Sequence, residues 1–245
     1  MLTYIGCSGW FYKDWKNIFY PEDLPVHNYF PFYTTYLNTV EINSSFYHFP
    51  RDKTVELWRK KAPPNFKFSF KVGREITHIK KMKHVQEVIL KFYRFHDLLQ
   101  DNLGCFLFQF PPSFKFTKYN LELILSQLDP CYKNVLEFRH SSWWTPEVIN
   151  SIQEKNIIFC TVSGFGLPEN LIVTNGMTYL RFHGKPTYVG CYTEQELSKW
   201  AARVKRLGLK ELYAYFNNTM AAHAVENASL FRRLLQDNTV GELDE

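Results

Sequence analysis

Short apolar runs rich in β-branched and aromatic residues recur along the chain, and segments of helical periodicity separate most of them. Eight such runs have the length and composition of β-strands. They span residues 2–6, 39–43, 67–72, 103–110, 134–139, 157–162, 178–183 and 211–217. Apolar residues three and four positions apart predict helices over residues 26–37, 53–61, 85–99, 119–128, 146–155, 194–207 and 221–235.

Two of the predicted helices carry clear start signals. Thr145 precedes Pro146, which combines an N-cap hydroxyl with proline at the first helical position. Thr193 and Glu196 have the spacing of a capping box, and Gly208 follows the end of the same helix.

Strand and helix alternate eight times within 245 residues and without a linker-like stretch. This pattern predicts an α/β protein, a TIM-type (β/α)8 barrel in a single domain over residues 1–245. An open doubly wound sheet is the alternative, but residues 6–9 lack the G-x-G-x-x-G spacing of its phosphate turn. Residues 163–176 contain Gly164, Gly166 and Pro168, so we expect a short or missing helix after the sixth strand.

Polar residues near the carboxyl end of each strand are phased to one face. Side chains alternate across a strand, so Glu137 and Arg139 share a face that is opposite to Leu136 and Phe138. The apolar face is expected to pack on the helices, and the polar face to point into the barrel. The same rule predicts that Thr161 and Ser163, rather than Cys160 and Val162, point inward on the sixth strand. Nine residues are predicted at the mouth in this way: Glu41, Asn43, Lys71, Gln109, Glu137, Arg139, Arg181, His183 and Asn217.

In (β/α)8 enzymes the carboxyl ends of the strands carry the catalytic groups, so these residues are a candidate ligand site. The alternative is an internal ion-pair network that closes the barrel without chemistry. Such a network would pair Glu137 with Arg181 and Glu41 with Lys71.

Composition and length place the chain among ordinary folded proteins. It is 45% hydrophobic and 22% charged, and its 18% of aromatic residues can build a large core. The first residues have no signal-peptide pattern and no run is long enough to span a membrane, so no membrane partner is expected. Five dispersed cysteines without a C-x-x-C pair predict neither disulfides nor a cysteine-rich zinc site, which favours a cytoplasmic location.

The formal net charge of +5 is unevenly distributed. Residues 59–94 hold eleven Lys and Arg residues against Glu75 and Glu87. Such a run is typical of a solvated helix face, but it also attracts phosphates or nucleic acid. A nucleic-acid-binding protein without catalysis therefore stays open as a second class of function, although no recognised nucleic-acid motif is present.

Seven ordered motifs closely resemble the family known as domain of unknown function 72, or YecE-like. They are Gly6–Trp10, Val40–Tyr47, Phe68–Lys71 with Thr77 and His78, Leu107–Pro112, Leu136–His140 with Trp143, Tyr179–Gly184, and Tyr215–Asn218 with Asn227 and Ala228. The resemblance covers nearly the whole chain. It implies a TIM-type barrel and supports the set of mouth residues, and it implies no particular reaction.

The mouth residues predict an anionic, phosphate-containing substrate such as a sugar phosphate or a nucleotide. Lys71, Arg139 and Arg181 are three cationic donors for phosphate. Glu41 and Glu137 are candidates for general base and general acid.

His183 is a further candidate for proton transfer. Six other residues are predicted to bind the substrate: Asn43, Gln109, Asn217, Asn218, Trp10 and Tyr47.

Other reactions remain open at this stage, as do the oligomeric state and whether the protein is an enzyme. A glycoside hydrolase would use the two glutamates and the aromatic residues Trp10, Tyr12, Tyr47 and Trp143, although rim packing is the favoured role of Trp143. A metal-dependent phosphoesterase would need converging ligands, but no H-x-H or H-E-x-x-H spacing exists, so no metal and no cofactor are expected. Lys71 as a Schiff-base lysine is a less favoured hypothesis.

Overall fold

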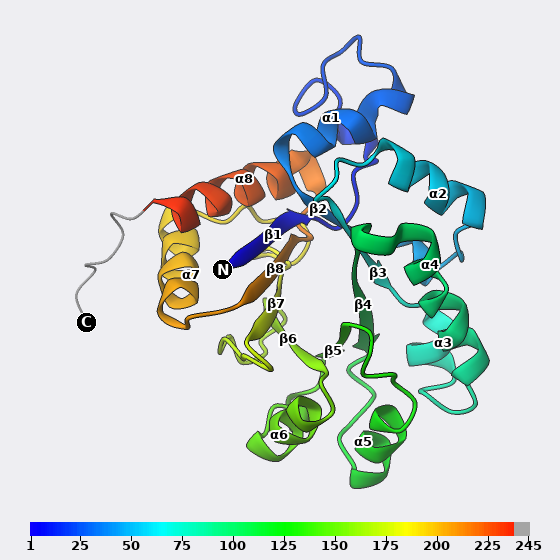
Figure 1. Ribbon diagram of the computed structural model, residues 1–245. Helices are drawn as coiled ribbons and strands as arrows, with labels where there is room; N and C mark the ends of the chain where they lie inside the picture. Colours follow the sequence, from blue (N-terminus) through cyan, green and yellow to red (C-terminus); the bar gives the residue numbers. More distant parts are fainter. Residues whose placement is uncertain (238–245) are drawn as a thin grey trace.

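Eight parallel strands close into a barrel in the computed structural model, which describes residues 1–237 (Figure 1). The strands are β1 Leu2–Cys7, β2 Thr39–Ile42, β3 Lys67–Lys71, β4 Leu103–Phe110, β5 Asn134–Phe138, β6 Ile158–Ser163, β7 Met177–Phe182 and β8 Glu211–Phe216. Each strand pairs with the next along the chain, and β8 pairs with β1. The predicted (β/α)8 barrel is confirmed, while the last residues of the predicted domain, 238–245, lie outside the described residues.

Helices surround the barrel (Figure 1). The α-helices are α1 Tyr29–Tyr36, α2 Asp52–Lys61, α3 Gln86–Tyr93, α4 Phe95–Leu99, α5 Lys118–Leu125, α6 Pro146–Glu154, α7 Glu194–Arg206 and α8 His223–Gln236. Short 3-10 helices are η1 Lys13–Trp15, η2 Val26–Asn28, η3 Ser44–Phe46, η5 Gln100–Asn102, η6 Ser141–Trp143 and η7 Met220–Ala222, and η4 Glu75–Ile79 is a π-helix. The chain passes from β6 to β7 without a helix, as the sequence predicts.

The predicted start signals form the expected contacts. Thr145 accepts a hydrogen bond from the backbone of Val148 at the start of α6, and Thr193 and Glu196 form a complete capping box on α7. The predicted helix over residues 85–99 is in fact two, since α3 ends before Arg94 and α4 begins after it. The last helix begins only at His223, because the two preceding alanines have positive φ angles.

Two apolar layers hold the barrel together. An outer layer, rich in phenylalanine, lies between the strands and the helices, and an inner layer includes Leu107, Tyr179 and Tyr215. Trp143 is completely buried and stacks on Phe138 with ring centroids 4.1 Å apart. This confirms packing, rather than ligand contact, as the role of Trp143.

The prediction of which residues point into the barrel is wrong on β6. Cys160 and Val162 belong to the inner layer, while the hydroxyl of Thr161 accepts from the backbone of Ile172 at 3.0 Å and Ser163 donates to Glu169. The reason is the missing helix. A loop covers the outside of β6, and the backbone and carboxylate groups of this loop require polar partners on the strand. A helix would present an apolar face and would require apolar partners instead.

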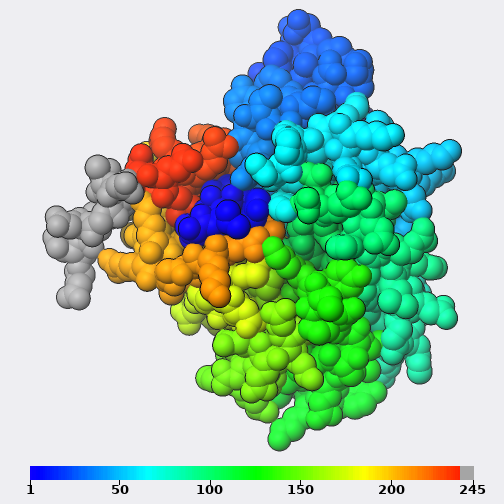
Figure 2. All heavy atoms as spheres, viewed as in Figure 1, coloured from blue at the N-terminus to red at the C-terminus, as the bar shows by residue number. Residues whose placement is uncertain are grey.

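The end of the barrel where the strands begin is filled by side chains. Tyr4 stacks on Tyr213 with centroids 4.8 Å apart, and Lys133 forms an ion pair with Glu211 at 2.7 Å. Figure 2 shows the N-terminal residues, in dark blue, in the middle of the surface seen in this view. Within residues 1–237, no helix combines the length and apolar character needed to cross a membrane.

Candidate functional site

Arg181 joins two buried glutamates across the mouth of the barrel. From the end of β7, its Nη2 donates to Oε1 of Glu41 at 2.6 Å and its Nη1 donates to Oε2 of Glu137 at 2.6 Å. All three side chains are at most 1% exposed. The predicted pair of Glu137 with Arg181 is therefore confirmed.

The predicted pair of Glu41 with Lys71 is wrong. Glu41 on β2 lies beside Ser69 of β3, so Lys71 emerges one inward-facing position closer to the open end. Lys71 forms no ion pair within 4.0 Å among the residues that the structure describes. Arg181 takes its place because its longer, forked side chain reaches both carboxylates at once.

Glu41 has two further donors, and neither is among the site residues predicted from the sequence. The hydroxyl of Ser8 donates to Oε1 at 2.9 Å, and the phenol of Tyr179 donates to Oε2 at 2.6 Å. Tyr179 could have been found from strand phase, since it lies two residues before Arg181 on the same strand. Ser8 follows the end of β1 and has a weaker signal.

Glu137 is held in its ionised form. It accepts from Nε of Arg139 as well as from Arg181. Burial by itself raises the pKa of Glu137, but the two guanidinium groups outweigh it and hold the pKa well below its usual range. Glu137 is thus a carboxylate at neutral pH.

His183 is neutral and its proton can be assigned. Burial, followed by the charges of Arg181 and Arg139, lowers its pKa well below the usual range. Its Nε2 lies 3.2 Å from Nη2 of Arg139, and because a guanidinium only donates, Nε2 must be the acceptor. The proton therefore sits on Nδ1. Nδ2 of Asn217 lies 3.1 Å from Nδ1, and because two donors cannot face each other, the amide of Asn217 has to rotate by 180° to turn its oxygen toward the ring.

Phe165, from the loop after β6, closes one side of this cluster. The guanidinium of Arg139 lies 3.6 Å from the centre of its ring, and the ring meets His183 at an edge-to-face angle of 69°. Strand phase could not have identified Phe165, because it lies in a loop.

Lys71 is the cation without a carboxylate partner in this cluster. Its Nζ lies 4.1 Å from the centre of the Phe46 ring. Burial, followed by the charge of Arg181, lowers its pKa to about 8. The mouth thus holds three cations, Lys71, Arg139 and Arg181, and two carboxylates, Glu41 and Glu137. Its net charge is therefore +1.

Asn43 and Trp10 line a hollow beside the mouth. Its volume is about 350 Å³. The side-chain oxygen of Asn43 is buried without a hydrogen-bond partner. Trp10 packs against Trp58, and Ser8 connects the hollow to the mouth because its hydroxyl donates to Glu41.

Three other predicted residues have different surroundings. Gln109 donates to the backbone of Phe110 at 2.9 Å. Tyr47 is 71% exposed and lines a separate hollow of about 380 Å³. Asn218 donates to the backbone oxygen of Gly190 and to Asn227 instead of facing the mouth cluster.

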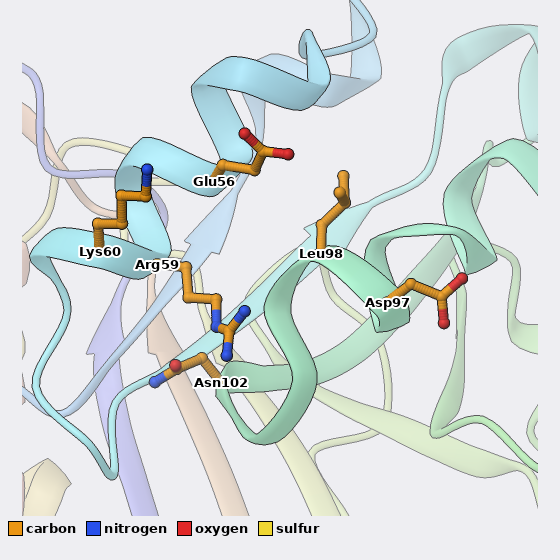
Figure 3. A pocket seen from close by; sticks show the side chains of 6 residues that line it. All are labelled: Glu56, Arg59, Lys60, Asp97, Leu98 and Asn102. Carbon is orange, nitrogen blue, oxygen red and sulfur yellow. The ribbon is translucent and has the colours of Figure 1, made fainter.

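A larger hollow lies between α2 and α4, on the outside of the barrel. Figure 3 shows Arg59 reaching from α2 toward Asn102, while Asp97 points away from both. The volume of this hollow is about 580 Å³. The hollow is lined by Glu56, Arg59, Lys60, Asp97, Leu98 and Asn102. None of the predicted site residues lines it, and Asn102 immediately precedes β4, so it is remote from the mouth.

Fold and site define a (β/α)8-barrel protein with a charged cluster at the carboxyl ends of its strands. The family model described as "Protein of unknown function DUF72" matches residues 4–244, and the chain belongs to this family. The chain is 27% identical to "UPF0759 protein YunF" of Bacillus subtilis (strain 168), across 96% of this chain and 95% of that protein. "UPF0759 protein YecE" of Escherichia coli (strain K12) is 25% identical across 46% of this chain and 39% of its own.

Solved structures of the same family have the same fold. A DUF72 family protein from Thermotoga maritima MSB8 is 30% identical with a TM-score of 0.87, across 97% of this chain and all of that chain. A DUF72 family protein from Enterococcus faecalis V583, 22% identical with a TM-score of 0.80 across 97% of this chain and 96% of its own, supports the fold alone. The family resemblance seen in the motifs is therefore confirmed.

Proposed function

We propose that the mouth of the barrel binds a small phosphate-containing anion, such as a nucleotide or a sugar phosphate, with Lys71 as its main cationic contact. One observation carries this proposal: Arg139 and Arg181 already face carboxylates, whereas Lys71 does not. An ammonium group withdrawn from water without a counter-charge is costly, so an anion that reaches it gains a favourable partner.

The hollow beside the mouth supports a ligand with a flat apolar part. Trp10, Tyr12 and Trp58 line it, and the buried oxygen of Asn43 has no hydrogen-bond partner. A nucleobase fits this chemistry, because it stacks on aromatic rings and its exocyclic amine donates to an amide oxygen. A nucleotide is therefore favoured over a sugar phosphate.

His183 keeps its predicted proton-transfer role in this proposal only if the ligand displaces Arg139 or Asn217 from its ring, because both ring nitrogens already have partners. His183 is neutral, whereas Glu137 is ionised by its two arginines and both oxygens of Glu41 already accept hydrogen bonds. The general-base and general-acid roles predicted for the two glutamates would require the substrate to displace these partners. Glu41 and Glu137 fit better as groups that orient Arg181 and Arg139.

The other candidate functions have less support. Glycoside hydrolysis has less support from the aromatic residues, since Trp143 is buried and Tyr47 lines a separate hollow. In the described part of the chain, the mouth holds no group of three metal-ligand atoms close together. Nucleic-acid binding relies on the basic segment 59–94, where Lys80 and Arg94 pair with acidic neighbours on the surface.

Isothermal titration calorimetry tests the proposal with adenosine monophosphate, ribose 5-phosphate and inorganic phosphate as probes. Lys71→Met should weaken binding by about tenfold or more, because the variant loses a charge-assisted contact. Lys91→Met, which removes an exposed lysine from α3, is the matched control and should bind like the wild type. Equal binding by the wild type and Lys71→Met would refute the proposal, as would the absence of binding for all three probes.

A further inference from the structure

A second cluster of chemically reactive side chains lies outside the mouth. Cys191, His223 and Glu226 bring together a thiol, an imidazole and a carboxylate whose ligand atoms all lie within 4.8 Å of one another. Oε2 of Glu226 is 4.0 Å from Sγ of Cys191 and 4.0 Å from Nδ1 of His223. None of the three has a role in the proposed anion site.

The first turn of α8 positions two of these groups. His223 is the first residue of the helix, and Glu226 follows three positions later. Residues three apart on a helix share a face, so the imidazole and the carboxylate project in the same direction. Cys191 comes from a different segment, between β7 and α7.

Two buried asparagines hold that segment against α8. Asn218 donates to the backbone oxygen of Gly190 at 3.0 Å, and Asn227 accepts from the backbone of Tyr192 at 3.0 Å and donates back to its oxygen at 2.9 Å. The two asparagines are also bonded to each other at 2.9 Å. The residues on both sides of Cys191 are therefore fixed relative to the helix that carries the other two groups.

We propose that Cys191, His223 and Glu226 form a binding site for Zn²⁺. A thiolate, an imidazole and a carboxylate are the three donor types that zinc takes, and three protein ligands leave a fourth position for water or another molecule. Tetrahedral zinc places its ligand atoms roughly 3.5 Å apart, so these side chains have to close by less than about 1.5 Å. Cys191 and Glu226 are exposed and free to make this movement.

Zinc binding here exchanges a proton for a metal bond without any change of oxidation state. The thiol of Cys191 now donates to Oδ1 of Asn227 at 3.6 Å. On binding, the thiol proton passes to the buffer and the thiolate bonds to zinc. Affinity should therefore rise with pH, and the heat of binding should depend on the ionisation enthalpy of the buffer.

Titration of the reduced protein with Co²⁺, as a spectroscopic substitute for Zn²⁺, tests this site. The wild type should bind one equivalent, with a thiolate-to-metal charge-transfer band in the near ultraviolet and visible bands of tetrahedral intensity, and Zn²⁺ should abolish both. Cys191→Ser should lose the charge-transfer band. Glu226→Gln should weaken binding on the order of tenfold or more while keeping the band.

Cys131→Ser is the matched control. Cys131 is also an exposed thiol, and hydrogen bonding to Asp129 raises its pKa, but the structure describes no histidine that completes a metal cluster with it. Cys131→Ser should bind Co²⁺ like the wild type. A charge-transfer band that survives in Cys191→Ser, or that disappears in Cys131→Ser, would overturn the proposal. Because Lys71 takes no part in this site, Lys71→Met should bind Co²⁺ normally, whatever happens to its phosphate affinity.

Discussion

The guanidinium of Arg181 lies 2.6 Å from Glu137, and both side chains are shielded from water at the mouth of the barrel. Arg181 also forms an ion pair with the second buried carboxylate, that of Glu41. Replacing Arg181 by methionine would leave two buried carboxylates without their shared counter-ion. We expect the free energy of unfolding to fall by about 3–5 kcal/mol, measured by urea denaturation.

The surface pair of Arg94 and Asp52 provides a control, since its two side chains are 65% and 47% exposed. Arg94→Met should cost less than about 1 kcal/mol. A triple variant that adds Glu41→Gln and Glu137→Gln to Arg181→Met should recover part of the loss, because the uncompensated charges are gone. Equal costs for Arg181→Met and Arg94→Met would contradict this account of the mouth.

Acid should destabilise the protein through His183. Its pKa is lowered in the folded state, so below the unfolded value of about 6.5 the unfolded chain binds the proton more readily. The stability that neutral His183 contributes is complete above that pH and is lost as the pH falls below it. His183→Gln should therefore reduce the pH dependence of the unfolding free energy between about pH 6.5 and pH 5 without abolishing it, because His78, whose pKa burial lowers to about 4, contributes over the same range.

Protonation of Glu137 also lowers the free energy of unfolding, but at lower pH. Its folded pKa is depressed, so its contribution is present above the unfolded value of about 4.3 and is lost as the pH falls further. Glu137→Gln should change only this lower part of the curve. If instead Glu137→Gln removed the loss near pH 6 and His183→Gln left it intact, the assignment of the two groups would be wrong.

The alternation of side chains along a strand predicts the inward-facing residues at the mouth only where the element that covers the outside of that strand is known. Glu41, Glu137 and Arg181 were found from sequence because a strand with helices on its outer face keeps apolar side chains there, so polar side chains near its carboxyl end have to point inward. On β6 the rule failed, since a loop and not a helix covers Thr161. An alternation rule has no information about which element packs on the outside.

Side-chain partners were harder to predict than positions. Glu41 and Lys71 are on adjacent strands, but the register sets Glu41 beside Ser69, and Arg181 of β7, a strand not adjacent to β2, pairs with Glu41 instead. Register and barrel diameter decide such contacts, and neither follows from local sequence. Phe165 and Cys191 lie in irregular segments, where periodicity gives no signal.

Lys71 should titrate near pH 8, about two units below an ordinary lysine. Its ammonium form is the one that attracts an anion, so phosphate affinity should fall as the pH rises from 7 to 9. Calorimetry across this range, on the wild type and on Lys71→Arg, measures the effect. The arginine variant stays charged and should keep its affinity at pH 9. A similar decline in Lys71→Arg would mean that a different group is titrating.

Phe165 should hold Arg139 and His183 in place from the loop side. Its ring is 40% exposed and lies 3.6 Å from the guanidinium of Arg139. Phe165→Leu keeps an apolar side chain but removes the aromatic face, which should cost about 0.5–1 kcal/mol of unfolding free energy. The His183 ring protons should also shift in the NMR spectrum, because a neighbouring aromatic ring is lost. Phe11→Leu, at another exposed ring, should leave those protons unchanged. If Phe165→Leu moved neither the stability nor the His183 signals, the contact between the loop and the mouth would not persist in solution.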